Sequence, residues 1–259
     1  MKKGFTLLEL SIVVVIVGLL LGGILTAKSM VSSSQVTATV SLIQQSDAAV
    51  IAFKQKFEYL PGDAPNVSTY GNGDRTIGCG TACAGQNHVA VWGGEIRDFW
   101  ANLYPDTYAA QISDVYTSGD NQNVPLVKMG KTGSGLVAAG LGPNNSWPAV
   151  TPKKNYYAII GPNGTVKFGA WKYFATTSST TAATTARQAK AFDEKMDDGI
   201  ANSGYVLSGS FGDYYTPDLG AINITAPAAC SSTTAYLVNS SAEECTPIIR
   251  IGAQAKSPQ

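Results

Sequence analysis

The chain begins with a long apolar segment and continues with a periodic apolar stripe. From Phe5 to Ala27 the only charged residue is Glu9. A helix of this length, rising about 1.5 Å per residue, can cross the ~30 Å hydrocarbon core of a membrane. Beyond it, apolar residues recur at spacings of three, four and seven, as on one face of a helix. They are Val36, Val40, Ile43, Val50 and Phe57.

This pattern predicts one continuous helix from Phe5 to about Glu58. It is apolar on all sides in its first half and one-sided in its second half. The predicted end follows from Pro61, because the residue before a proline disfavours the helical conformation. Polar residues are expected on the faces away from the stripe; they are Gln35, Gln44, Gln45, Asp47, Lys54 and Lys56.

The rest of the chain alternates turn-rich segments with short apolar ones. Residues 61–91 form a loop rich in Gly, Asn and Asp, and residues 105–150 give no clear pattern apart from short apolar pieces at 124–129 and 135–141. The strongest strand signals are at 155–161 and 166–176, with Pro162-Asn163-Gly164 as a hairpin turn between them. Residues 245–252 are a further candidate strand. These elements predict an α+β head with an antiparallel sheet.

Two short helices are predicted within the head. The first spans 92–104, with Glu95 and Arg97 expected to be solvated; its apolar face is Ile96, Phe99, Trp100 and Leu103. The second spans 186–198 and is closed by Gly199; its apolar face is Ala189, Phe192 and Met196.

Composition narrows the class of protein. Lys plus Arg number 18 and Asp plus Glu number 18, so the formal net charge is zero, and no nucleic-acid partner is expected because such a partner requires a basic patch. The four cysteines fall into two close pairs, Cys79/Cys83 and Cys230/Cys245. With His88 as the only histidine, a zinc site is poorly supported. Behind a membrane-targeting segment, the pairs indicate two disulfides in an oxidising compartment, and four free thiols are the alternative.

Two groups of carboxylates are candidate calcium ligands. Asp63 and Asp74 lie among glycines in the first loop, and calcium binds carboxylate and carbonyl oxygens. Turn chemistry alone accounts for both residues and is the simpler explanation, because the loop lacks the acidic ladder of an EF-hand. Asp193, Asp197 and Asp198 cluster near one helix end and could hold a metal, whereas a surface helix with a glycine cap is the simpler explanation. We therefore expect no cofactor, with calcium as the one candidate.

No catalytic constellation accompanies these groups. His88 lies in a loop without a nucleophile elbow, and the chain contains neither a P-loop nor a dinucleotide-binding glycine motif. We expect no catalytic residue and no enzymatic activity.

The N-terminal segment differs from an ordinary secretory signal. Its apolar stretch exceeds the usual 7–15 residues or so, and Lys2 and Lys3 place the bulk of the chain outside the cytoplasm. Glu9 is unexpected there, because an ionisable group at the centre of a membrane helix costs about 2.5–3.5 kcal/mol on insertion scales. A signal anchor that tolerates Glu9 by snorkelling is one explanation.

The run Lys3-Gly4-Phe5-Thr6-Leu7-Leu8-Glu9-Leu10 supports another explanation. It resembles the class III signal of the type IV pilin and type II secretion pseudopilin superfamily. The resemblance implies that a prepilin peptidase cuts between Gly4 and Phe5 and N-methylates Phe5. It also implies that Glu9 pairs with the new amine of a neighbouring subunit, and a paired carboxylate is tolerable in lipid.

The resemblance also implies a type IV pilin-like organisation of the chain. The expected parts are a leader at 1–4, a membrane and polymerisation helix at 5–28, its amphipathic continuation at 29–60, and a head at 61–259. A disulfide between Cys230 and Cys245 would bound a loop like the variable loop of pilins.

The expected function is a structural subunit of a type IV pilus or type II secretion pseudopilus. Its expected partners are like subunits, the prepilin peptidase, an inner-membrane assembly platform and, before assembly, membrane lipid. Before assembly it would cross the inner membrane once, with its head in the periplasm, and then join a filament that can reach the cell surface. A pilin-displayed binding module, acting as an adhesin or uptake head, is the alternative.

Overall fold

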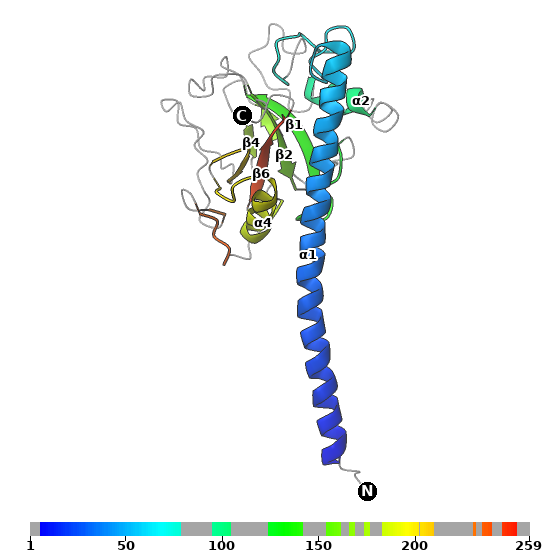
Figure 1. The fold of residues 1–259 in the computed structure, drawn as a ribbon, viewed down its shortest axis with the longest axis vertical. Coiled ribbons are helices and arrows are strands. Elements are labelled where there is room, and N and C mark those ends of the chain that lie inside the picture. The colour runs from blue at the N-terminus through cyan, green and yellow to red at the C-terminus, as the bar shows by residue number, and fades with distance from the viewer. Residues whose placement is uncertain are drawn as a thin grey trace.

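The protein consists of one long helix with a head packed along its second half. A computed structural model describes residues 6–78, 95–104, 124–141, 154–161, 166–168, 174–176, 183–201, 203–209, 230–231, 235–239 and 245–252. In Figure 1 the head lies against the C-terminal half of the helix, and the N-terminal half stands clear of it.

Helix α1 spans Leu7–Phe57, 51 residues, or about 77 Å at 1.5 Å per residue. It begins at Thr6, whose side chain accepts a hydrogen bond from the Glu9 backbone N–H. It ends at Glu58, which adopts the left-handed conformation (φ 65°) typical of a helix C-terminus. The predicted helix is confirmed at its C-terminal end, while Phe5 lies outside the described residues.

The predicted apolar stripe of α1 faces the head. Val36, Ile43 and Val50 are buried in the main core, and Val40 packs against it. One polar residue was misplaced by the pattern: Asp47 lies on this face, where its carboxylate accepts a hydrogen bond from the backbone N–H of Gly252. That prediction is wrong because a period of 3.6 puts residue 47 one turn from both Ile43 and Val50.

The head has an antiparallel four-stranded sheet in the order β1-β2-β6-β5. Its strands are β1 (Gly135–Leu141), β2 (Lys154–Ile160), β5 (Val206–Gly209) and β6 (Thr246–Arg250). Strand β6, near the end of the chain, lies between β2 and β5 and completes the sheet. The buried faces of β1 and β2 pack with the α1 stripe and with α2 in one core. The molecule is therefore an α+β fold, as predicted.

The predicted strands are partly correct. Strands β2 and β6 lie where the sequence placed them, and β1 forms in a segment that gave no strand signal beyond its apolar residues. The segment 166–176 contains two short strands, β3 (Val166–Phe168) and β4 (Phe174–Thr176), which pair with each other in a separate sheet. The predicted hairpin between β2 and this segment is therefore wrong, because the β2 pairs found in the sheet are with β1 and β6.

Both predicted short helices are present. Helix α2 (Glu95–Leu103) buries Phe99 and Trp100 beside Tyr157 of β2, with ring centroids 6.1 Å and 5.9 Å from the tyrosine ring. Helix α4 (Ala186–Met196) buries Ala189 and Phe192. It is followed by Gly199 at a positive φ of 73°, so the predicted end near this glycine is confirmed. Residues 92–94, where α2 was predicted to begin, lie outside the described residues.

Candidate functional site

The apolar side chains in the first half of α1 are exposed and are not covered by the part of the chain that the structure describes. Leu7 is 87% exposed and Leu19 is 74% exposed, whereas a core helix of a soluble domain would bury such residues. By its length and composition, α1 is long and apolar enough to cross a membrane. The most apolar 18-residue stretch of this helix is not buried in the structure. A contiguous apolar surface of this size marks a site of contact with lipid or protein.

The start of this helix is organised around Glu9. The Oε2 atom of Glu9 accepts hydrogen bonds from the backbone N–H and the hydroxyl of Thr6, both at 2.8 Å. In return, the Glu9 N–H donates to the Thr6 hydroxyl oxygen at 3.3 Å. This reciprocal arrangement is a capping box, which satisfies backbone donors at a helix N-terminus.

The capping role of Thr6 was missed by the sequence reasoning. Its signal was available, because Thr-x-x-Glu before an apolar run is the sequence pattern of a capping box. The predicted processing residues Gly4 and Phe5 lie outside the described residues.

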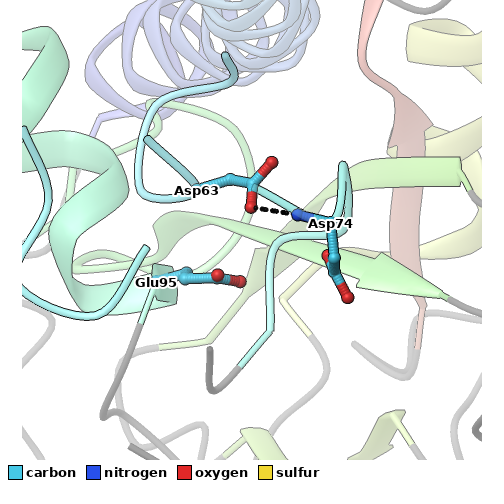
Figure 2. A group of neighbouring side chains, drawn as sticks. All are labelled: Asp63, Asp74 and Glu95. Carbon is cyan, nitrogen blue, oxygen red and sulfur yellow. Dashed lines mark hydrogen bonds between the residues drawn. The ribbon is translucent and has the colours of Figure 1, made fainter. Parts of the chain in front are cut away.

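The calcium candidates Asp63 and Asp74 do come together, and Glu95 of α2 joins them. Each offers a carboxylate oxygen within 4.8 Å of the others. Figure 2 shows them coming from the loop that follows α1 and from the first turn of α2. Asp63 and Glu95 are buried, so the prediction that Glu95 is solvated is wrong.

Backbone N–H groups hold these carboxylates. The two oxygens of Asp63 accept from Asp74 N at 3.0 Å and Arg75 N at 2.9 Å. Those of Glu95 accept from Asn72 N at 3.1 Å and Gly78 N at 2.8 Å. The carboxylates thus organise the 61–78 loop, and these contacts account for their position.

Burial raises the pKa of Glu95 to about 8. The neighbouring charges of Asp63 and Asp74 act in the same direction, and the N–H groups of Gly78 and Asn72 oppose it. Burial likewise raises the pKa of Asp63, against the hydrogen bond from Arg75 N. The calcium interpretation of this cluster stays a prediction.

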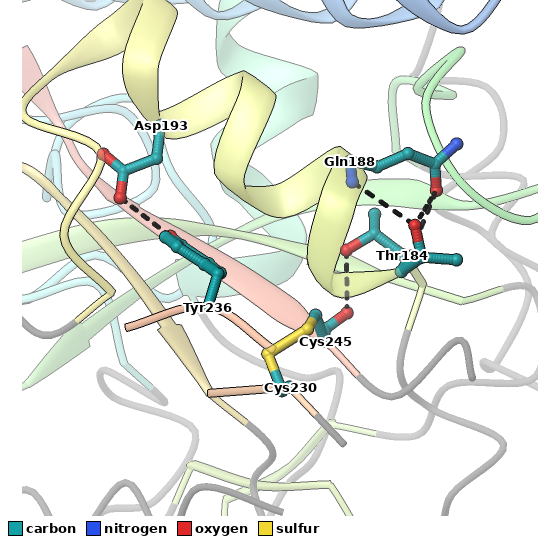
Figure 3. Close-up of a disulfide and its surroundings, with 7 residues drawn as sticks. Thr184, Gln188, Asp193, Cys230, Tyr236 and Cys245 are labelled. Carbon is teal, nitrogen blue, oxygen red and sulfur yellow. Dashed lines mark hydrogen bonds between the residues drawn. A yellow bond between two sulfur atoms is a disulfide. The ribbon is translucent and has the colours of Figure 1, made fainter. Parts of the chain in front are cut away.

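The second carboxylate group, Asp193, Asp197 and Asp198, also comes together. Each of its members binds a different part of the head. Asp193 is buried and accepts from the Tyr236 hydroxyl at 2.7 Å (Figure 3) and from Gly199 N at 3.3 Å. Burial raises its pKa to about 6. Asp197 accepts from the N–H groups of Tyr205 and Val206, and Asp198 accepts from Ile200 N at 2.8 Å.

This second group therefore fixes the turns that follow α4. Its metal-binding interpretation stays a prediction.

One of the two predicted disulfides is present. Cys230 and Cys245 are bonded and fully buried, beside the Asp193–Tyr236 hydrogen bond (Figure 3). Cys245 also exchanges backbone hydrogen bonds with Thr184, which precedes α4. The disulfide thus joins the start of β6 to the segment that carries Tyr236. The predicted Cys79–Cys83 pair and His88 lie outside the described residues.

The N-terminal segment matches a known family model. Residues 1–25 match the prokaryotic N-terminal methylation motif, which is the hallmark of type IV pilins and pseudopilins. The match includes the capping box and most of the exposed apolar half of α1, so the resemblance seen at residues 3–10 is confirmed. Comparisons with curated proteins and with solved structures give no match.

The raised pKa of Glu95 predicts that the free energy of unfolding of the head falls as the pH rises. Its folded pKa is about 8 and its ordinary value is 4.5, so between these values the folded head retains a proton that the unfolded chain releases. Its contribution to the free energy of unfolding is complete below pH 4.5 and falls towards pH 8, by at most about 1.4 kcal/mol per pH unit. Glu95→Gln should remove this part of the slope.

Urea unfolding of the chain in detergent micelles, followed by tryptophan fluorescence, measures this slope. Glu194→Gln is the matched control, because Glu194 is about half exposed on α4, and it should follow the wild-type curve. An unchanged slope in Glu95→Gln would contradict the assignment.

Proposed function

We propose that this protein is a structural filament subunit, of a type IV pilus or a type II secretion pseudopilus. A prepilin peptidase cuts it after Gly4 and methylates Phe5, and an assembly platform in the inner membrane then adds it to a filament through α1. The observation that carries this proposal is an exposed apolar helix that begins with a capped carboxylate, inside the methylation motif.

The exposed half of α1 must be shielded from water both before assembly and within a filament. In water, about 25 cal/mol is lost for each Å2 of apolar surface left exposed. Membrane lipid covers the surface before assembly, while the head lies in the periplasm. Within a filament, the same surface packs against the α1 helices of other copies. The transition exchanges one apolar environment for another, so the apolar surface alone gives little preference for the filament.

The carboxylate of Glu9 supplies a directional preference. Its Oε2 is bonded to Thr6, while its Oε1 takes no hydrogen bond from the part of the chain that the structure describes. Cleavage after Gly4 would create an ammonium group on Phe5, and a neighbouring subunit's Phe5 can donate to Oε1. Within lipid such a pair is favourable where an isolated carboxylate is costly.

The head fits the proposed compartment. The Cys230–Cys245 disulfide is of the kind that persists in an oxidising compartment such as the periplasm. No catalytic role is part of the proposal.

Processing at Gly4 is the first prediction of the proposal. Gly4→Leu places a bulky side chain at the cut, and the variant should keep its leader, whereas the wild type loses residues 1–4. Intact mass of the two proteins, purified from cells that contain the peptidase, measures this. Ser11→Ala, a change further along the same helix, is the control and should be cut normally. Normal processing of Gly4→Leu would contradict the assignment.

Assembly through Glu9 is the second prediction. Glu9→Ala should be cut normally but polymerise poorly, because the Phe5 ammonium of each neighbour is left without its partner. Removing one partner of a buried ion pair costs about 3–5 kcal/mol, so the association constant should fall by more than about 100-fold. The yield of sheared filaments, relative to total subunit, measures the effect.

Thr6→Val is the companion variant for this prediction. It removes the hydroxyl that bonds Oε2 but keeps the carboxylate, so its loss of filaments should be smaller than that of Glu9→Ala. Wild-type filament yield from Glu9→Ala would refute the proposed pairing.

A further inference from the structure

A single charged residue on the head-facing side of α1 requires an explanation. Between Lys28 and Lys54 the only charged residue is Asp47, and it is partly buried against the head. Burial raises the pKa of Asp47, and a hydrogen bond from Gly252 N opposes this shift. A residue placed here for solubility would lie on the outer face of the helix, where Gln44 and Gln45 are exposed.

Asp47 contacts the far end of the chain at close range. Its Oδ1 accepts a hydrogen bond from the backbone N–H of Gly252 at 3.0 Å, across 205 residues of sequence. A β-carbon on Gly252 would lie 2.7 Å from the Oδ2 of Asp47, and the three heavy atoms nearest to it all belong to Asp47. A side chain at position 252 would therefore displace the Asp47 carboxylate from this position.

Gly252 is well anchored in the head. It follows β6, which is hydrogen-bonded to strands on both sides, and the preceding residue, Ile251, donates its N–H to Asn155 O of β2 at 3.0 Å. Tyr157 of β2 lies next to Asp47: burial first and the Asp47 charge second raise the pKa of its phenol. The carboxylate thus lies beside β2 and the end of β6, the two inner strands of the sheet.

A second polar contact between α1 and the head lies closer to the membrane half of the helix. The Thr39 hydroxyl accepts from Met129 N at 3.2 Å. Thr39 and Asp47 are eight positions apart, or about 12 Å along a helix. The apolar stripe packs between them. Because the hydrophobic effect is non-directional and a hydrogen bond is directional, the two hydrogen bonds add orientational contacts at two positions along the helix.

We propose that Asp47 is a positioning residue which, through Gly252, locks the orientation of the head on α1. If subunits pack through α1, each copy must hold its head in the same orientation relative to α1. The lock is a property of the single chain, so it stands or falls independently of the filament proposed above.

Three variants test the lock. Asp47→Ala removes the acceptor. Gly252→Ala forces the carboxylate away and should reproduce the effect of Asp47→Ala. The double variant should be no worse than Asp47→Ala alone, because the added methyl group then meets no carboxylate, and such non-additivity is the mark of a direct contact. Asp47→Asn retains an acceptor oxygen and is the matched control.

The measurement is the distance between two nitroxide labels on the full chain in detergent micelles. Labels attached through non-natural ketone residues at exposed Gln44 and Asn239 leave the cysteines untouched. The wild type and Asp47→Asn should give one narrow distance distribution. Asp47→Ala, Gly252→Ala and the double variant should give equally broadened distributions.

Hydrogen exchange of β2 and β6 amides distinguishes orientation from stability. The proposal requires these amides to stay protected in Asp47→Ala. Loss of their protection would overturn it, because Asp47 would then hold the sheet itself together. A narrow wild-type distribution in Asp47→Ala, or additive broadening in the double variant, would also overturn it.

Discussion

The structure depends on an apolar helix surface that the described part of the head does not cover. The first half of α1 extends beyond the head, and its side chains are exposed on every face that the structure describes. A surface of this kind is stable only in lipid or against other apolar helices. The position of Glu9, the length of α1 and the placement of the head at its far end are all consistent with that requirement.

In the head, carboxylates that are buried or partly buried hold loops and turns in place by accepting hydrogen bonds from backbone N–H groups. Asp63 and Glu95 bind the 61–78 loop through its N–H groups, Asp193 and Asp197 bind the turns after α4, and Asp47 binds the end of β6. Burial disfavours the charged forms of four of these carboxylates, those of Asp47, Asp63, Glu95 and Asp193, and raises their pKa. The stability of the head is thereby coupled to pH.

Local patterns in the sequence predicted the elements that depend on periodicity. The stripe Val36–Ile43–Val50 placed the head on the correct face of α1, and the aromatic and branched residues of β2 identified a central strand. Long-range pairing could not be predicted in this way: β6 lies between β2 and β5, and β3 turns back on β4. Charge alone was also a poor guide to burial. Glu95 is buried and Asp47 is partly buried, and they accept hydrogen bonds from residues 17 and 205 positions away.

Photocross-linking from the exposed half of α1 tests the central claim most directly. A benzophenone amino acid in place of Ile16, which is half exposed, samples what covers this surface in cells that process the protein. We expect a ladder of cross-linked copies of this chain, and we expect no ladder when the same substitution is combined with Gly4→Leu. Adducts to lipid alone, with no cross-linked copies in the processed protein, would contradict it.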